Sequence, residues 1–167
     1  MSSIGKKIRL SQIFDSRTKR TVIIPMDDGL IDGAEKGLRH PISKVKEIVA
    51  GGADAILGFK GIIKLSHEHI EGKGILMNLT ASSSLSFHTK KTLVANVEDA
   101  LKLGLSGVAV HVNISSKYEA KMMKNLGTIS SVCDEFGMPL MALMYPRTES
   151  ENGDNNYLDI KENEPDE

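Results

Sequence analysis

The sequence has no tryptophan and a single cysteine, Cys133, among its 167 residues. One thiol cannot form an internal disulfide, so we expect a fold without cross-links and a reducing, cytoplasmic setting. No stretch approaches the roughly 18 apolar residues of a membrane-spanning helix, and no apolar segment follows the first lysines. We therefore expect neither a membrane span nor a secretory signal. With 26% charged and 40% hydrophobic residues, the composition is that of a globular domain.

Aromatic residues are also scarce, at 4%, and the net charge is only −1. That charge is unevenly distributed, because residues 149–167 contain eight acids and one lysine, which leaves +6 for the rest. The lysines of the remainder are scattered over predicted helices, as on a solvated surface, so we expect no nucleic-acid partner. The acidic end has almost no apolar residues and cannot form a core. We divide the chain into a domain over 1–147 and an acidic tail over 148–167.

Five apolar runs predict β-strands that are buried on both faces. Their apolar residues are nearly continuous rather than alternating, which is typical of parallel strands covered on both sides. The runs are 21–26, 54–59, 74–79, 107–112 and 139–145.

Segments with apolar residues at helical spacing lie between most of these strands. They cover 40–52, 91–104 and 116–137, where the second includes Leu93 and each ends at or beside a glycine. The link over 60–73 is short for a helix, and we predict a loop with at most one turn. Repeated strand–helix units leave an open doubly wound sheet or a (β/α)₈ barrel as the two architectures.

Two observations favour the barrel. No glycine-rich phosphate loop follows the first strand, which counts against a dinucleotide-binding sheet. Polar residues follow the ends of all five strands, as in barrel enzymes. These are Asp27, Lys60, Asn78, Thr80, His111, Asn113, Tyr145 and Arg147. Since a barrel needs eight strands, the chain is expected to hold about the first five units of an incomplete (β/α)₈ barrel.

The acids that follow the first strand have two interpretations. Asp27 at a strand end, beside Pro25 and Met26, would be partly desolvated, which suits a general base. Asp28 would reinforce this effect if the two side chains converged. The competing interpretation is an Asp-Asp-Gly turn in which an aspartate caps backbone amides. Residue types alone favour the turn.

Other polar residues near the strand ends also have two interpretations. Tyr145 near Arg147 could act as a general acid or hold an anion, or both could simply pack at the sheet margin. Lys60 could form a Schiff base, but a lysine at a strand end more often reaches solvent. His111 and Asn113 suit hydrogen bonds to a polyhydroxylated ligand, although a histidine here could equally be a core residue with its hydrogen bonds satisfied. The histidine pair in "SHEHIEGKG" lacks a third ligand, so we expect no metal, and no motif indicates a cofactor.

Several segments together carry a more specific signal than any one of them. "IGKKIRLSQIF…TKRTVIIPMDDG", "GGADAILGFKGI", "SGVAVHVNISS" and "VCDEFGMPLMALMYPR" resemble the archaeal-type class I aldolase family, in the branch of 2-amino-3,7-dideoxy-D-threo-hept-6-ulosonate synthases. The resemblance runs from about Ile4 to Arg147. Its sharpest motifs are P-M-D-x-G and M-Y-P-R.

The resemblance implies a (β/α)₈ barrel enzyme, a lyase or transferase, that binds a phosphorylated keto sugar as a covalent imine. The synthases use aspartate semialdehyde as acceptor in a route to 3-dehydroquinate and aromatic amino acids, and full-length members commonly form homo-oligomers. The family's proton acceptor maps onto Asp27 and its proton donor onto Tyr145. Substrate contacts map onto the remaining motif residues, and we add His111 as a candidate. These are Asp28, Gly29, Leu30, Ile31, Pro146 and Arg147. Fructose-bisphosphate aldolase on the same scaffold is the alternative activity.

Two departures from the family pattern stand out. Asp28 occupies a position where the family usually has histidine, which places an anion beside the predicted base. The family's Schiff-base lysine lies on the sixth strand, and nothing in 148–167 resembles that strand. We therefore carry over no residue for this role, Lys60 included, and expect this chain to be a fragment or non-catalytic remnant that is inactive by itself. The acidic tail is then expected to be the connection toward the missing strand.

Overall fold

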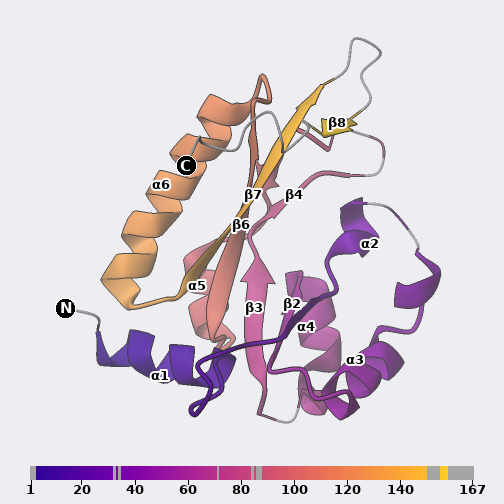
Figure 1. Ribbon diagram of the computed structural model, residues 1–167, viewed down its shortest axis with the longest axis vertical. Helices are drawn as coiled ribbons and strands as arrows, with labels where there is room; N and C mark the ends of the chain where they lie inside the picture. The colour runs from indigo at the N-terminus through magenta and orange to yellow at the C-terminus, as the bar shows by residue number, and fades with distance from the viewer. Residues whose placement is uncertain are drawn as a thin grey trace.

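The computed structural model describes residues 3–31, 33, 35–70, 72–83, 85, 88–149 and 155–157. Its centre is a curled sheet in which five strands are parallel and follow one another in chain order (Figure 1). These strands are β1 (Ile23–Pro25), β2 (Ala55–Gly58), β3 (Gly74–Asn78), β6 (Gly107–Ile114) and β7 (Leu140–Glu149). The five predicted strands are thus confirmed, and the curl is consistent with part of a barrel.

The strand ends differ from the prediction at the carboxyl side of the sheet. β7 continues beyond Tyr145 and Pro146 to Glu149, because its backbone keeps pairing with β6 up to Ile114. Beyond that point the short strand β8 (Asn155–Tyr157) pairs antiparallel with β7 from Arg147 to Glu149. Proline is tolerated in β7 because a strand near a sheet margin needs fewer amide donors. The rest of the predicted connection lies outside the described residues.

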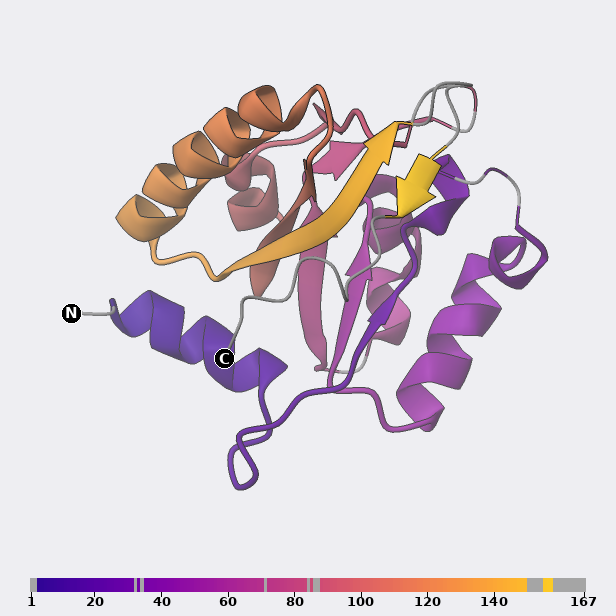
Figure 2. The ribbon, with the colours of Figure 1, turned by 45° about the horizontal axis from the view of Figure 1, so that its top comes forward.

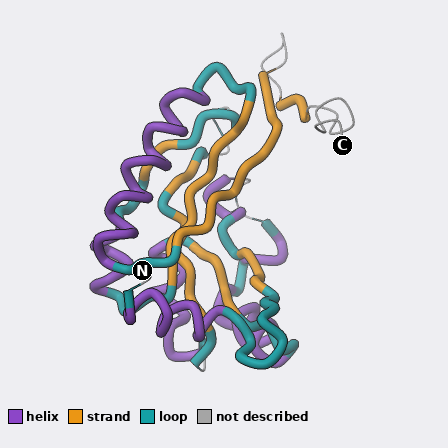
Figure 3. Tube along the Cα trace, turned by 60° about the vertical axis from the view of Figure 1, so that its left-hand side comes forward, coloured by secondary structure: helices purple, strands orange, loops and turns teal. Residues whose placement is uncertain are grey.

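Four helices cover one side of the sheet (Figure 2). They are α3 (Pro41–Ala50), α4 (Lys60–Ser66), α5 (Val97–Lys102) and α6 (Glu119–Phe136). Proline occupies the first turn of α3, Asn96 caps α5 through its side chain, and α6 ends at Gly137 with φ +60°. Figure 3 shows α6 running along the strands that it covers.

The prediction of a loop over 60–73 was wrong. This segment forms α4 followed by the 3₁₀ turn η2 (His67–His69). A seven-residue helix has little stability of its own, but Ile62 and Ile63 pack against buried residues of the sheet. Tertiary packing therefore decides this element.

The prediction that Leu93 belongs to a helix was also wrong. Leu93 lies in the short strand β5 (Thr92–Leu93), which pairs antiparallel with β4 (Thr80–Ala81). Helix α5 begins only after Asn96, whose side chain accepts a hydrogen bond from the Asp99 amide. Local capping thus sets the start of the helix later than its apolar spacing suggests.

The helix α1 (Ile4–Ile13) was not expected from the apolar pattern. It lies across the end of the sheet at which the parallel strands begin (Figure 1). Gly74 at the start of β3 permits the close approach, because a Cβ there would lie 2.7 Å from the Gln12 carbonyl oxygen. Lys6 pairs with Asp134 of α6 at 3.1 Å, which ties α1 to the helical layer. This arrangement leaves the opposite end of the sheet, where the strands finish, open for a site.

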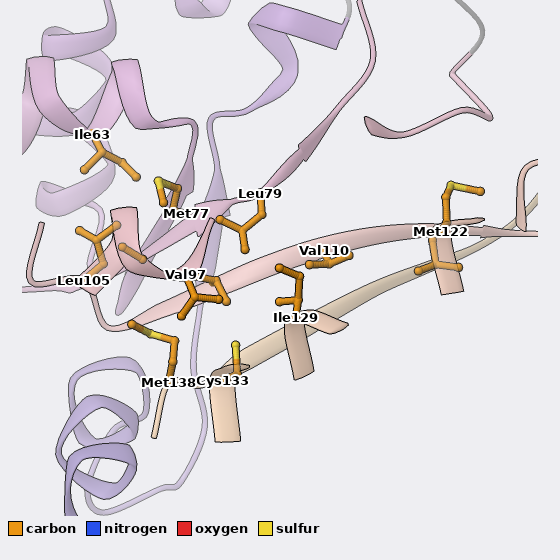
Figure 4. Packing of buried hydrophobic residues seen from close by; sticks show 13 residues of the cluster. Ile63, Met77, Leu79, Val97, Leu105, Val110, Met122, Ile129, Cys133 and Met138 are labelled. Atoms are coloured by element: carbon orange, nitrogen blue, oxygen red, sulfur yellow. The ribbon is translucent and has the colours of Figure 1, made fainter. Parts of the chain in front are cut away.

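The main core lies between the sheet and the helices α5 and α6. Figure 4 shows Met122, Ile129 and Cys133 of α6 among the side chains that surround Val110. Cys133 is 1% exposed, and burial raises the pKa of its thiol to about 11. The thiol therefore serves as a packing group. No described helix is long and apolar enough to cross a membrane.

Candidate active site

A cavity of about 260 Å³ lies on the inner face of the curled sheet, toward the ends of the parallel strands. Its apolar wall comes mainly from side chains of β1, β2 and β7, and its polar groups follow β1 or lie within β6 and β7. The lining residues are Ile23, Pro25, Asp27, Asp28, Ile31, Leu57, His111, Met141, Leu143 and Tyr145. A cavity with an apolar wall and a few converging polar groups is a typical ligand site.

Asp27 is the buried carboxylate of this cavity. It is 4% exposed and directly follows β1, whose pairing continues through a 2.7 Å bond from the Met26 amide to the Leu57 carbonyl. Its Oδ2 accepts a 2.6 Å hydrogen bond from Nδ2 of Asn78 at the end of β3. Asp28 is exposed and begins the short helix α2 (Asp28–Ile31). The two acids both line the cavity but lie in different environments.

His111 and Tyr145 come together on the adjacent strands β6 and β7. Their rings stack with centroids 5.0 Å apart and an interplanar angle of 30°. The guanidinium carbon of Arg147 lies 5.4 Å from the centre of the Tyr145 ring, within cation–π range. The Tyr145 ring thus contacts both His111 and Arg147, but only His111 and Tyr145 are among the residues that line the cavity.

His111 is held in its neutral form. Burial, together with the positive charges of Lys91 and Arg147, lowers its pKa from 6.5 to about 4. Its backbone amide donates to Thr80 Oγ1 at 2.8 Å, while Nδ1 is buried and has no hydrogen-bond partner among the described residues. A neutral imidazole with an unused nitrogen beside a cavity can donate to or accept from a bound hydroxyl group.

This lowered pKa predicts a pH dependence of stability. The unfolded chain protonates His111 near pH 6.5, whereas the folded chain does so only near pH 4. Between these values the unfolded state binds more protons, so stability falls as the pH falls, and the full contribution remains only above pH 6.5. The predicted loss reaches at most about 3 kcal/mol. Urea unfolding of the native chain and of His111→Gln from pH 8 to pH 4 checks this; parallel curves would contradict it.

Lys91 is a residue of this region that sequence reasoning missed. It is 3% exposed, and its Nζ donates to Ser82 Oγ at 2.9 Å. It lies before β5, outside any apolar run, so neither strand position nor periodicity indicated its burial. Asn78 and Thr80 were noted only as polar residues at a strand end. Their bonds to Asp27 and His111 were not foreseen, because they join residues far apart in the sequence.

The structure separates some of the other predicted contacts from this cavity. Gly29 and Leu30 line a second cavity of about 470 Å³, beside the 3₁₀ turn η1 (Lys36–Leu38) and α4. Ile31 is buried and lines the Asp27 cavity. Pro146 pairs with Ile114 in the sheet and is absent from the residues that line either cavity. Only some of the predicted substrate-contact residues therefore line the cavity that contains Asp27.

Lys60 is not among the residues that line the candidate site. Its Nζ forms an ion pair with Asp99 Oδ1 at 3.0 Å, and its side chain is 42% exposed. The hydrogen bond from Lys60 is the main cause that lowers the pKa of Asp99. Lys60 is thus engaged in an ion pair at the surface. Among the described residues no group of three or more His, Cys, Asp or Glu side chains is arranged to hold a metal ion.

Comparison with known proteins identifies relatives of this chain. A model of DeoC/LacD family aldolases matches residues 21–165. The chain is 42% identical over 146 residues to 2-amino-3,7-dideoxy-D-threo-hept-6-ulosonate synthase 1 of Archaeoglobus fulgidus, covering 86% of this chain and 55% of that protein. It is 34% identical over 148 residues to the corresponding synthase of Halobacterium salinarum, covering 88% and 55%.

A similar fold occurs in a solved structure of an archaeal fructose-1,6-bisphosphate aldolase. That structure has its catalytic Lys covalently bound to the carbinolamine intermediate of the substrate. The TM-score is 0.73 at 21% identity, and the match covers 86% of this chain and 58% of that one. The chain thus spans a little over half the length of the proteins that it matches.

Proposed function

Because the chain belongs to the DeoC/LacD aldolase family, we propose that its cavity is the proton-transfer part of a Schiff-base aldolase or transaldolase site for a phosphorylated keto sugar. The observation that carries this proposal is the position of Asp27 and Tyr145. A buried carboxylate and a phenol line one cavity at the end of a parallel sheet where barrel enzymes place their catalytic groups.

In the proposed reaction Asp27 acts as base and Tyr145 as acid. The carboxylate takes the proton of the sugar hydroxyl next to the carbon–carbon bond that breaks, and the hydroxyl carbon becomes a carbonyl. The electron pair of the broken bond passes into the imine. Tyr145 later returns a proton to the carbon of the imine-bound fragment that took part in the broken bond. His111 offers a neutral hydrogen-bonding group to a hydroxyl of the same substrate. Asp28 and Ile31 complete the wall.

The amine of the imine is proposed to come from outside the residues of this chain. No lysine lines the cavity in the part of the chain that the structure describes. In the related aldolase structure a catalytic Lys carries the intermediate. The resemblance noted above places the family's lysine on a sixth strand, for which this chain has no matching segment. A segment carrying that strand would complete the site.

Within the family we favour the hept-6-ulosonate synthase reaction, with aspartate semialdehyde as acceptor and a role in aromatic amino acid biosynthesis. The support is the identity to two synthases, 42% and 34%, against 21% to the aldolase structure. Fructose-bisphosphate aldolase is the alternative activity on the same scaffold. We place the active form in the cytoplasm, because a single cysteine suits a reducing compartment, and in a homo-oligomer, as the family resemblance suggests.

Borohydride trapping tests the proposal. Residues 1–147 are joined to the C-terminal part of the Archaeoglobus synthase that this chain does not match. The chimaera and the 167-residue chain are then each incubated with a ketose phosphate and sodium borohydride, and weighed by mass spectrometry. We expect a stable adduct on the chimaera and none on the chain. An adduct on Lys91 of the chain would overturn the assignment of the amine, and a chimaera that traps nothing would count against the function.

Cleavage assays distinguish the two candidate activities. If the synthase assignment holds, the chimaera exchanges the sugar fragment onto aspartate semialdehyde and cleaves fructose bisphosphate slowly. Cleavage of fructose bisphosphate at the rate of an ordinary aldolase would favour the alternative.

A further inference from the structure

A buried chain of hydrogen bonds connects the carboxylate of Asp27 to the backbone of His111. Asn78 Nδ2 donates to Asp27 Oδ2 at 2.6 Å, and Asn78 Oδ1 accepts from the Thr80 amide at 3.0 Å and from Thr80 Oγ1 at 3.1 Å. The Thr80 hydroxyl oxygen in turn accepts from the His111 amide at 2.8 Å. The chain therefore links Asp27 after β1 and Asn78 at the end of β3 to Thr80 at the start of β4 and His111 within β6.

The donors in this chain allow a single orientation of the Asn78 amide. The Thr80 amide can only donate, so the side-chain oxygen of Asn78 must face it. The Thr80 hydroxyl already accepts from the His111 amide and uses its one proton for the same Asn78 oxygen. The NH₂ group of Asn78 must then face Asp27, whose Oδ2 can only accept. The backbone of two strands thus sets the direction of a bond to the carboxylate.

Burial makes this bond important for the charge on Asp27. Asp27 is 4% exposed, Asn78 0% and Thr80 1%. An ionised carboxylate in such surroundings is unfavourable unless it accepts hydrogen bonds, and a charged acceptor makes stronger bonds than a neutral one. Asn78 therefore gives one oxygen of this buried carboxylate a hydrogen-bond partner. Because Asn78 binds Oδ2, the other carboxylate oxygen is the one left to take a proton from a ligand.

We propose that Asn78 and Thr80 are positioning residues for Asp27, which fix its carboxylate with Oδ2 as acceptor and Oδ1 as the proton-accepting atom. This inference rests on the proposed role of Asp27 as base. The same hydrogen bonds also hold the backbone of His111, whose ring stacks on Tyr145. One buried network thus positions the carboxylate of Asp27 relative to His111, the residue on which the Tyr145 ring stacks.

Nuclear magnetic resonance of the ¹⁵N-labelled 167-residue chain tests the proposal without any substrate. We expect one side-chain amide proton of Asn78 well downfield of exposed asparagine amides, because it donates to a buried carboxylate. Asp27→Leu, which is similar in size and cannot accept, removes this downfield shift. Thr80→Ser retains it, whereas Thr80→Val, which has the shape of threonine without its hydroxyl, weakens it. In Thr80→Val the His111 amide exchanges about tenfold faster.

The comparison of valine with serine separates positioning from general stability. Both variants can lower the melting temperature, but only valine removes the hydroxyl that orients Asn78. The inference would be overturned if the chemical shift of the Asn78 side-chain amide proton were unchanged in Asp27→Leu. Identical spectra for Thr80→Val and Thr80→Ser would also overturn it. A chain that shows the expected resonance while the chimaera forms no borohydride adduct would retain the network and lose the proposed aldolase function, so the two failures are distinguishable.

Discussion

Replacement of Asp27 by Asn is expected to lower the turnover of the chimaera by roughly 10²–10⁴, the range that general acid–base catalysis supplies. The amide keeps the size of the carboxylate but cannot take a proton from the substrate hydroxyl. Its side-chain oxygen can still accept from Asn78, which donates to Asp27 Oδ2 at 2.6 Å in the native chain. The fold and the wall of the cavity should therefore persist, and the loss should fall on kcat more than on KM.

Asp28→Asn is the matched control for this experiment. Asp28 lines the same cavity and is the next residue in the chain, but it is exposed and begins α2. Removing its charge should change turnover far less than the Asp27 substitution does. Steady-state cleavage rates of both variants, with circular dichroism to verify folding, give the comparison. Equal rates for Asp27→Asn and the native chimaera would return Asp27 to the role of a turn residue.

Replacement of Tyr145 by Phe is the second large effect that we expect. Phenylalanine retains the ring that stacks on His111 at 5.0 Å and the face presented to Arg147 at 5.4 Å, so only the hydroxyl is lost. If that hydroxyl returns the proton to the sugar carbon, turnover should fall by about 10²–10⁴. Formation of the imine itself should continue, because it requires the lysine of the completed site.

Trapping and turnover together identify the step that Tyr145 serves. The chimaera with Tyr145→Phe should still yield a borohydride adduct while product release slows. Tyr118→Phe is the matched control, since Tyr118 precedes α6 and contacts Lys90 and Lys117 rather than the cavity. A Tyr145→Phe chimaera with native turnover would assign the tyrosine to packing alone. Simultaneous loss of adduct and turnover would assign it to substrate binding instead.

Asp28 gives the site an unusual charge pattern. The resemblance predicts histidine at this position, and the chain has an acid one residue after the proposed base. The structure reduces the consequence, because Asp28 is exposed at the start of a helix, where a negative charge is favourable. Solvent screens an exposed charge from Asp27, so two adjacent acids can coexist beside one cavity.

The pattern of residues along the chain is sufficient to predict the parallel strands and most of their helices. Continuous apolar runs, a proline in the first turn of α3 and a glycine after α6 each involve neighbouring residues. Such local signals can therefore be recognised in the sequence alone. The motifs around Asp27 and Tyr145 also identified the family, because they are short stretches of neighbouring residues. Both residues line one cavity, as barrel topology predicts.

The contacts between polar residues, in contrast, depend on how distant strands come together in the fold. Asn78 reaches Asp27 across 51 positions of the chain, and Thr80 reaches His111 across 31. The burial of Lys91 and the helix over Lys60–Ser66 likewise depend on contacts with distant strands. Hydrophobic periodicity reports which face of an element is covered, but not which side chain lies opposite. Asp27 and Asp28 both line the cavity but differ in burial, because Asn78 of a distant strand contacts Asp27 whereas Asp28 begins α2 and is exposed.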